Sequence, residues 1–270
     1  MAAQPPLARD FFDRPAPEVA PALLGCVLAH ETADGLVAVE LTEVEAYSGQ
    51  ADPASHAYRG MTGRNAVMFC APGHAYVYFT YGMHFCVNVV CQPAGTASAV
   101  LLRAGRVVAG EPLARRRRTA RRQAADPLAA AAGSGVGADT PGTAAGIPGV
   151  TPARDLARGP ARLCQALAIT RDQNGADLCA PASPLRLLPG HVALAVDDIT
   201  QDDTVREVIT RDDAARYDTA RHGKSRRTAE PVISTGPRVG VTAAAEIAWR
   251  FWLAGDPTVS AYRLHKRRTR

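Results

Sequence analysis

Short apolar runs, several alternating with polar residues, dominate the first part of the chain and predict β-strands. They cover residues 26–30, 36–45, 75–80, 84–91 and 99–103. Asp34-Gly35 lies between the first two runs and is a strong signal for a tight hairpin turn. Tyr81-Gly82-Met83 separates the third run from the fourth, which predicts a second hairpin with an aromatic residue at its tip. The fifth run is nearly all apolar, so we expect a short buried strand that ends in Arg103.

Helical segments are expected on both sides of these strands. Residues 7–25 predict a helical segment interrupted by prolines, in which residues 21–25 resemble a helix start that closes on a glycine cap. Residues 159–167 predict the start of a helix with an early proline, and residues 243–253 predict a helix that carries both tryptophans. Two shorter elements are a strand at 191–197 and a short loop or strand at 237–241.

One long segment has a composition that argues against a packed structure. Most of residues 120–153 are Ala, Gly, Pro and Thr, with almost no large apolar side chain. Such a segment cannot bury enough surface to offset its ordering entropy. We therefore expect a disordered low-complexity insertion within a single domain that spans residues 1–270, with a loose basic tail at 265–270.

Charge and cysteine usage narrow the class of protein. The chain has 270 residues, is 47% hydrophobic and carries a formal net charge of +5, which suits a polyanionic partner. Its six cysteines form no CxxC pair and no zinc-like spacing, and several lie in apolar runs. This usage predicts reduced, buried thiols in a cytoplasmic protein. We expect no signal peptide and no transmembrane segment, because neither pattern is present.

The stretch TEVEAYSGQADPASH mixes acids, an aromatic residue and a histidine just after a predicted strand. Alternate residues of a strand share a face, so Leu41, Glu43, Glu45 and Tyr47 are expected to point the same way. A carboxylate at a strand end beside an aromatic ring suits a general base in a partly dry pocket. The simpler alternative is that both glutamates are solvated residues of an edge strand.

Two further segments carry candidate site residues. Tyr76, Tyr78 and Tyr81 recur closely in a chain that is only 6% aromatic, although tyrosine also favours strands. Asn88 lies within an apolar strand, where its amide must find partners. An arginine at the end of a buried strand is usually paired with an anion or an acidic side chain, so Arg103 is expected to pair with a residue such as Glu45 or Glu111. Aromatic rings that can stack on a base, together with polar side chains that can hydrogen-bond to its edge, are typical of a nucleobase-binding site.

Five motifs in order resemble the alkyladenine (3-methyladenine) DNA glycosylase family. They are EAYSGQADPASH, RNAVMFCAPGHAYVYFTYGMHFCVN, LLRA, GPARLCQALAI and RVGVTAAAEIAWRFWL. The resemblance runs from about Leu7 to Arg263, apart from the insertion. It implies an α+β fold: a single mixed domain with a curved antiparallel β-sheet surrounded by helices and a protruding DNA-inserting β-hairpin.

The resemblance also implies an activity, a monofunctional glycosylase of base excision repair. Such an enzyme flips alkylated or deaminated purines (the 3-methyladenine, 7-methylguanine, hypoxanthine and ethenoadenine class) out of duplex DNA, hydrolyses the N-glycosidic bond and leaves an abasic site. By motif, Glu45 is the general base that activates water, and Arg103 and the main-chain carbonyl of Val239 position that water.

The remaining implied roles concern the base pocket and the hairpin. Tyr47, His56 and Tyr78 would wall the base pocket. Asn88 would discriminate against undamaged guanine. At the hairpin tip, Tyr81 would fill the hole left in the base stack and Met83 would lie beside it.

The resemblance further implies a monomer that acts on double-stranded DNA with a damaged purine, needs no metal or organic cofactor, and works in the cytoplasm at the nucleoid. We expect residues 115–122, which are rich in arginine, to add non-specific DNA affinity.

Several alternatives stay open at this point. The chain could be a non-catalytic DNA lesion-binding protein, although a pure binder has no need of a water-activating carboxylate. It could also act on free nucleosides, against which the hairpin wedge and the basic surface argue. Glu43 could compete with Glu45 as the base, and His84 stands where the family often has an aromatic residue.

Overall fold

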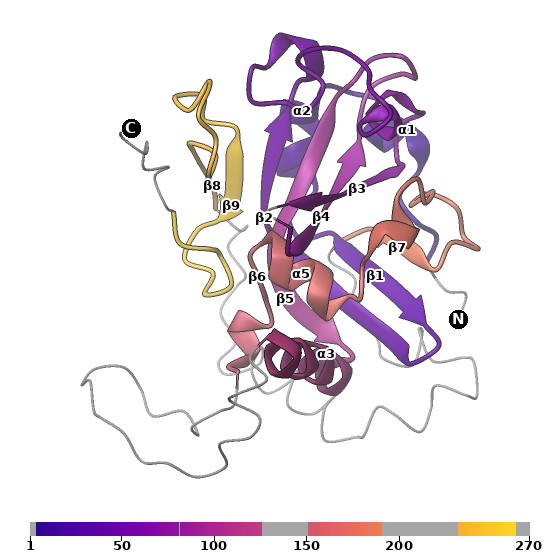
Figure 1. Ribbon diagram of the computed structural model, residues 1–270, viewed down its shortest axis with the longest axis vertical. Coiled ribbons are helices and arrows are strands. Elements are labelled where there is room, and N and C mark those ends of the chain that lie inside the picture. Colours follow the sequence, from indigo (N-terminus) through magenta and orange to yellow (C-terminus); the bar gives the residue numbers. More distant parts are fainter. Residues whose placement is uncertain (1–3, 81, 126–150, 191–231, 263–270) are drawn as a thin grey trace.

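The computed structural model describes residues 4–80, 82–125, 151–190 and 232–262, and these form one antiparallel sheet with helices packed against it (Figure 1). Its strands are β1 (Val27–Thr32), β2 (Gly35–Tyr47), β3 (Ala75–Thr80), β4 (His84–Val90), β5 (Ala99–Ala109), β6 (Ala157–Arg158), β7 (Leu185–Leu188), β8 (Ile233–Gly236) and β9 (Arg250–Leu253). Its α-helices are α1 (Arg9–Phe12), α2 (Ala16–Ala22), α3 (Glu111–Ala125) and α5 (Pro160–Ala166).

The sheet is open and its main strand order is β3-β4-β5-β2-β1-β7. Both predicted hairpins are confirmed, since β1 pairs with β2 and β3 pairs with β4. The first turn is Ala33-Asp34, one residue earlier than the predicted Asp34-Gly35, because Gly35 already pairs with Thr32. A third hairpin, β8–β9, comes from the far end of the chain and adds β9 to β2 beside Glu45 (Figure 1). The fold is therefore the expected single α+β domain.

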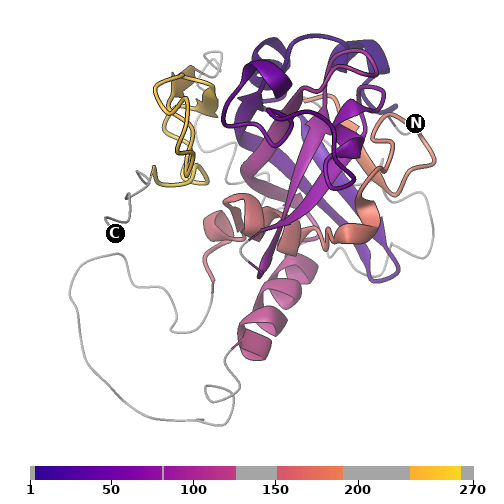
Figure 2. The ribbon, with the colours of Figure 1, turned by 45° about the horizontal axis from the view of Figure 1, so that its top comes forward.

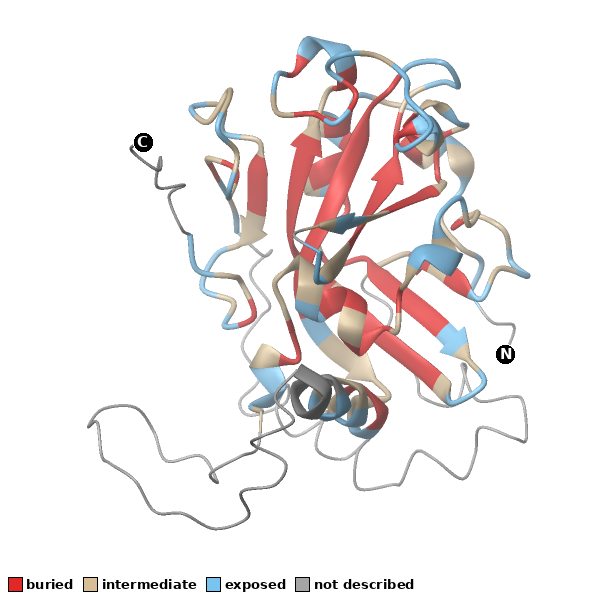
Figure 3. Cartoon of the chain, viewed as in Figure 1, coloured by how far each residue is buried: buried red, intermediate tan, exposed pale blue. Residues whose placement is uncertain are grey.

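One face of the sheet forms the main core, with apolar side chains from alternate positions of the central strands. Val77, Val87 and Leu102 lie on this face under α1, α2 and α5. Figure 3 shows how completely the central strands are buried, whereas much of the outer side of α3 is exposed. The opposite face carries a smaller apolar cluster that includes Tyr76 and Met68. This second face holds the candidate site.

The helical prediction for residues 243–253 is wrong. Ala244 has a φ of 49°, which an α-helix does not allow, and Arg250–Leu253 form strand β9. Phe251 packs into the main core while Trp252 lies under the Arg250 guanidinium, 4.7 Å from its ring centre. The alanine-rich sequence favours a helix locally, but backbone pairing with β2 overrides that preference.

Two other predicted boundaries shift. Helix α2 begins at Ala16 and contains Pro21, so residues 21–25 are the end of that helix rather than its start. Strand β5 continues to Ala109, which places Arg103 in mid-strand and not at a strand end.

Helix α3 covers the arginine-rich segment and lies beside α5 (Figures 1 and 2). Arg117 donates to the carbonyl oxygen of Ala166 on α5, and Arg115 binds both Glu111 and the carbonyl oxygen of Thr151. Part of this basic segment therefore serves to fix the helix. Residues 120–125 of the expected insertion are helical, and 151–153 lead into a 3-10 turn.

Several predicted segments, the cysteines and the predicted absence of a membrane span remain to be compared with the structure. Residues 126–150, the expected strand at 191–197 and the tail at 265–270 lie outside the described residues. All six cysteines are free thiols; four are buried, but Cys179 is half-buried and Cys70 is exposed. Within the part of the chain that is described, no helix is long and apolar enough to cross a membrane.

Candidate functional site

The sheet places the sequence motifs next to one another in a single row. Across five neighbouring strands, Tyr76, Asn88, Leu101, Glu45 and Arg250 stand opposite one another in register. Alternation along each strand sends these side chains to the face away from the main core. Motifs that are far apart in sequence therefore meet because antiparallel pairing aligns them.

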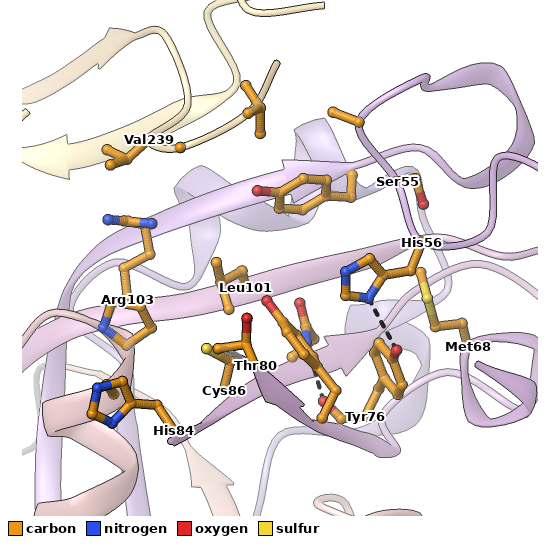
Figure 4. Close-up of a pocket in the computed structure, with 18 of the residues that line it drawn as sticks. Ser55, His56, Met68, Tyr76, Thr80, His84, Cys86, Leu101, Arg103 and Val239 are labelled. Carbon is orange, nitrogen blue, oxygen red and sulfur yellow. Dashed lines mark hydrogen bonds between the residues drawn. The ribbon is translucent and has the colours of Figure 1, made fainter. Parts of the chain in front are cut away.

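A pocket of about 410 Å³ opens on this face (Figure 4). Eight of the residues singled out from the sequence line it: Tyr47, His56, Tyr76, Tyr78, His84, Asn88, Arg103 and Val239. Glu45 is not in this lining; it lies behind it, in contact with Tyr47, Arg103 and Val239. The pocket also has walls that the sequence did not indicate, among them Met68, Thr80 and the first residues of α5.

The aromatic wall is built from β3 and the loop that follows β2. The rings of Tyr76 and Tyr78 are stacked with centroids 5.5 Å apart, and the ring of His56 meets Tyr78 edge-on at 4.6 Å. His56 Nδ1 lies 3.0 Å from the Tyr76 hydroxyl, a contact drawn in Figure 4. Tyr76 therefore lines the pocket itself and also holds His56 in place, a role that the sequence did not reveal. Asn88 Nδ2 donates to the carbonyl oxygen of Tyr76 at 3.1 Å, which fixes the amide in the pocket floor.

Burial keeps these side chains uncharged. Burial, together with the nearby positive charge of Arg64, lowers the pKa of His56, so its imidazole is neutral at pH 7. Burial also raises the pKa of Tyr78 well above its usual value, and contact with Cys86 raises it further. The wall therefore offers neutral, electron-rich rings that suit a flat and electron-poor ligand.

The opposite wall includes Arg103 and Val239, and behind it lies Glu45, whose exposed fraction is 0%. Glu45 Oε1 accepts a hydrogen bond from the Val239 backbone N–H at 2.7 Å and lies 3.2 Å from Arg103 Nη1. Its Oε2 accepts a hydrogen bond from the Tyr47 hydroxyl at 2.9 Å. The alternative of a solvated edge glutamate is wrong, because β2 is a central strand and both Glu43 and Glu45 are fully buried.

The expectation that Leu41 shares a face with Glu43, Glu45 and Tyr47 is also wrong. Leu41 belongs to the main core with Val44 and Ala46. The reason is an irregularity in the β2–β5 register, which shifts between Leu41 and Glu43 and again after Glu43. A bulge of this kind changes which face successive side chains reach.

Glu43 and Arg103 form a buried ion pair beside Glu45. Arg103 Nε donates to Glu43 Oε1 at 2.8 Å, and Arg250 Nε donates to the same oxygen at 2.7 Å. Ser260 donates to Glu43 through its backbone N–H and its hydroxyl. Of the two partners predicted for Arg103, Glu45 is therefore confirmed, and Glu111 pairs with Arg115 instead.

The pKa directions in this cluster follow from its charges. Burial alone would raise the pKa of Glu43, but the charges of Arg103 and Arg250 and the hydrogen bonds from Ser260 outweigh it and lower the pKa. Burial opposes the charge of Arg103, yet Glu45 and Glu43 hold its pKa above the usual value. Both groups are ionised at neutral pH, and Glu43 has its oxygens committed to donors.

A second buried ion pair holds the Val239 segment in place. Arg238 binds Asp52 through two hydrogen bonds, at 2.5 and 2.9 Å, and both side chains have an exposed fraction of 0%. Arg238 also donates to the carbonyl oxygen of Ala46 and lies over the Tyr47 ring at 4.7 Å. Sequence reasoning missed this pair; its one available signal is a charged residue within a short apolar segment.

The hairpin tip is only partly described. Gly82 has a φ of 66°, which the tight connection requires, and Met83 is 56% exposed. Tyr81 lies outside the described residues. His84, at the start of β4, contributes to the pocket lining (Figure 4). Among the described side chains, no group of three or more His, Cys, Asp or Glu could hold a metal ion.

The chain is similar to known proteins over nearly its whole length. The family model described as "Methylpurine-DNA glycosylase (MPG)" matches residues 10–257. A protein of Streptomyces avermitilis is 43% identical over 267 residues, covering 98% of this chain and 95% of the relative. One from Leifsonia xyli subsp. xyli is 44% identical, covering 97% of this chain and 94% of the relative. Both relatives carry the name "Putative 3-methyladenine DNA glycosylase". A match of this extent to the family model and to full-length relatives shows that the chain belongs to the methylpurine-DNA glycosylase family.

Proposed function

We propose that this chain is a monofunctional DNA glycosylase of base excision repair. It flips an alkylated or deaminated purine out of duplex DNA and hydrolyses the bond between that base and its sugar. The observation that carries the proposal is the buried Glu45, held directly behind the lining of an aromatic pocket by three residues of that lining, Arg103, Tyr47 and Val239. Family membership supports the same reaction class.

The pocket chemistry supports a purine as the ligand. Tyr47, His56 and Tyr78 supply neutral rings against which a base can stack. Purines alkylated at N3 or N7 carry positive charge, so cation–π attraction to these rings favours them over normal bases. Asn88 lies in the pocket floor with its amide held by Tyr76, where it would clash with the exocyclic amine of undamaged guanine.

The hydrolytic step uses water as the nucleophile and Glu45 as its base. A carboxylate has about four lone-pair sites, and three donors already contact Glu45. The fourth lone-pair site of Glu45 can accept a proton from water while the oxygen of that water bonds to C1′ of the sugar. The C1′–N bond breaks at the same time, and its electron pair leaves with the base. The negative charge of Glu45 also stabilises the positive charge that develops on the sugar.

Arg103 and Val239 would position this water, Arg103 through its guanidinium and Val239 through its main-chain carbonyl. The β3–β4 hairpin would enter the DNA minor groove. Tyr81 at its tip would occupy the place of the flipped base, and Met83 beside it is exposed enough to contact DNA. Unstacking a base costs a few kcal/mol, and an inserted side chain offsets part of that cost. We propose a monomer that needs no metal or organic cofactor for this reaction.

The experiment is base release from a duplex oligonucleotide with one hypoxanthine, and from methylated DNA, measured with excess protein. We expect release by the native chain and a loss of at least about 100-fold in Glu45→Gln, with DNA binding retained. Glu40→Gln is the matched control, since Glu40 lies on the same strand but has a partly exposed side chain paired with Arg106. Tight lesion binding without release from either substrate would instead identify a lesion-binding protein.

A second measurement separates DNA from free nucleosides as the substrate. Binding that weakens steeply as salt rises supports contacts to the phosphate backbone. Cleavage of free nucleosides with little salt dependence would overturn the assignment to DNA.

A further inference from the structure

Four charged side chains form a continuous chain behind the pocket, in the order Glu45, Arg103, Glu43 and Arg250. The successive contacts are 3.2, 2.8 and 2.7 Å. None of the four side chains is more than 7% exposed. Two carboxylates and two guanidinium groups give the cluster a net charge of zero, which is the condition under which buried charges are tolerated.

The backbone alone does not fix the direction of Arg103. In the β2–β5 register Ala104 stands opposite Glu43 and Leu102 stands opposite Val44, so the pairing skips Arg103. Arg103 is the extra residue of a bulge, and bulges of this kind redirect side chains beside functional sites. Side-chain contacts must therefore decide where its guanidinium points.

Glu43 supplies the contact that decides it. A guanidinium is a rigid planar fork, so a bond to its Nε sets the plane in which both terminal nitrogens lie. Glu43 Oε1 accepts from Arg103 Nε at 2.8 Å, and in that plane Nη1 lies 3.2 Å from Glu45 Oε1. Nη2 is directed at the Ser260 hydroxyl, 3.4 Å away.

Glu43 is itself held from the other side by the C-terminal part of the chain. Arg250 Nε and the Ser260 hydroxyl both donate to Oε1, and the Ser260 backbone N–H donates to Oε2 at 2.7 Å. Arg250 is in turn fixed by the carbonyl oxygen of Ser260 and stacks over Trp252. Glu43 thus has no freedom to follow Arg103 if that side chain turns away.

From these contacts we propose that Glu43, anchored by Arg250 and Ser260, is a positioning residue that aims the Arg103 guanidinium at Glu45 and at the reacting water. This inference rests on the proposed glycosylase reaction. It gives Glu43 a role other than that of a competing base: its oxygens face donors of the protein, and its effect on the reaction passes through Arg103.

The test compares three variants in single-turnover base release across a range of pH. Glu43→Gln keeps the shape but removes the charge, Glu43→Asp keeps the charge, and Glu43→Gln with Arg250→Gln removes both charges so that the cluster stays neutral. We expect Glu43→Gln to slow release by about 10–100-fold with little change in DNA affinity, and to change the pH profile of release. Glu43→Asp should recover part of the rate.

The neutral double variant guards against a simple failure to fold. It should fold, yet release bases slowly, because a neutral amide oxygen replaces the carboxylate as the acceptor for Arg103 Nε–H and holds the guanidinium less firmly. Arginine side-chain NMR gives a readout that does not need activity. The Arg103 Nε–H signal, identified by its absence in Arg103→Lys, should be protected from exchange in the native chain and lose that protection in the double variant.

Two results would overturn the inference. One is a folded double variant with the native rate and pH profile. The other is an Arg103 Nε–H signal that keeps its protection without Glu43. If the native chain released no base, while the NMR signal behaved as expected, the glycosylase proposal would fail and the positioning of Arg103 by Glu43 would stand.

Discussion

Replacing Asp52 by Asn should destabilise the fold more than any change to an exposed ion pair. Asp52 accepts two hydrogen bonds from Arg238, and neither side chain is exposed to solvent. Asparagine has nearly the same shape, but its NH2 group would face the guanidinium donors. Arg238 would then remain buried among Tyr47, Trp249 and backbone carbonyls without its counter-charge.

The expected loss follows from the burial of this pair. Removing one partner of a buried ion pair costs about 3–5 kcal/mol, because the other charge stays buried. Arg238 keeps its bonds to the carbonyl oxygens of Ala46 and Ala244, so we expect about 3 kcal/mol. A loss of that size is a large share of the stability of a typical domain, about 5–15 kcal/mol.

The assay is urea unfolding of Asp52→Asn beside a matched control, Asp155→Asn. Asp155 pairs with Arg158 at 3.3 Å, but 23% and 34% of the two side chains are exposed, so the control should lose no more than about 1 kcal/mol. The dependence of the unfolding free energy on urea concentration should have the same slope in both variants. Equal losses in the two variants would refute the reasoning that burial of the Asp52–Arg238 pair sets its energetic weight.

Two further predictions concern single buried groups. Tyr47→Phe removes the hydroxyl that donates to Glu45 at 2.9 Å but keeps the ring, so the free energy of unfolding should fall by about 1–3 kcal/mol. The control, Tyr58→Phe, changes a half-exposed ring and should leave the stability nearly unchanged. Equal losses in the two variants would contradict the importance of the Tyr47–Glu45 hydrogen bond. His30 is buried with its Nδ1–H donating to the carbonyl oxygen of Leu167 at 2.6 Å, and burial lowers its pKa. Below the unfolded pKa of about 6.5 the unfolded chain binds a proton that folded His30 resists, so stability should fall as the pH drops from 7 to 5.5, and His30→Gln should flatten that fall; an unchanged slope would show that other groups cause it.

Local chemistry allowed much of this structure to be predicted. Turn residues such as Asp34-Gly35 act over a few positions, so both early hairpins could be placed from sequence. Strand alternation then explains why predicted site residues such as Tyr78 and Asn88 reach one pocket. The assignment of their individual roles came from family motifs, and those roles stay predictions.

What the sequence could not show depends on contacts between distant segments. Strand β9 was mistaken for a helix because its pairing partner, β2, lies far back in the chain. The bulge that moves Leu41 to the core depends on the register with β5, which no local pattern encodes. The Asp52–Arg238 pair could not be predicted either, because its two residues lie far apart in the sequence.

The β2–β9 pairing also has a consequence for synthesis of the protein on the ribosome. Glu43 and Arg250 are 207 residues apart in sequence. At a synthesis rate of about 5–20 residues per second, Arg250 is made roughly 10–40 s after Glu43. Until then two neighbouring carboxylates share the single guanidinium of Arg103, so the buried charges are unbalanced. The nascent chain therefore cannot complete this cluster of charges before Arg250 has been made, and a product interrupted before Arg250 should be inert toward DNA bases.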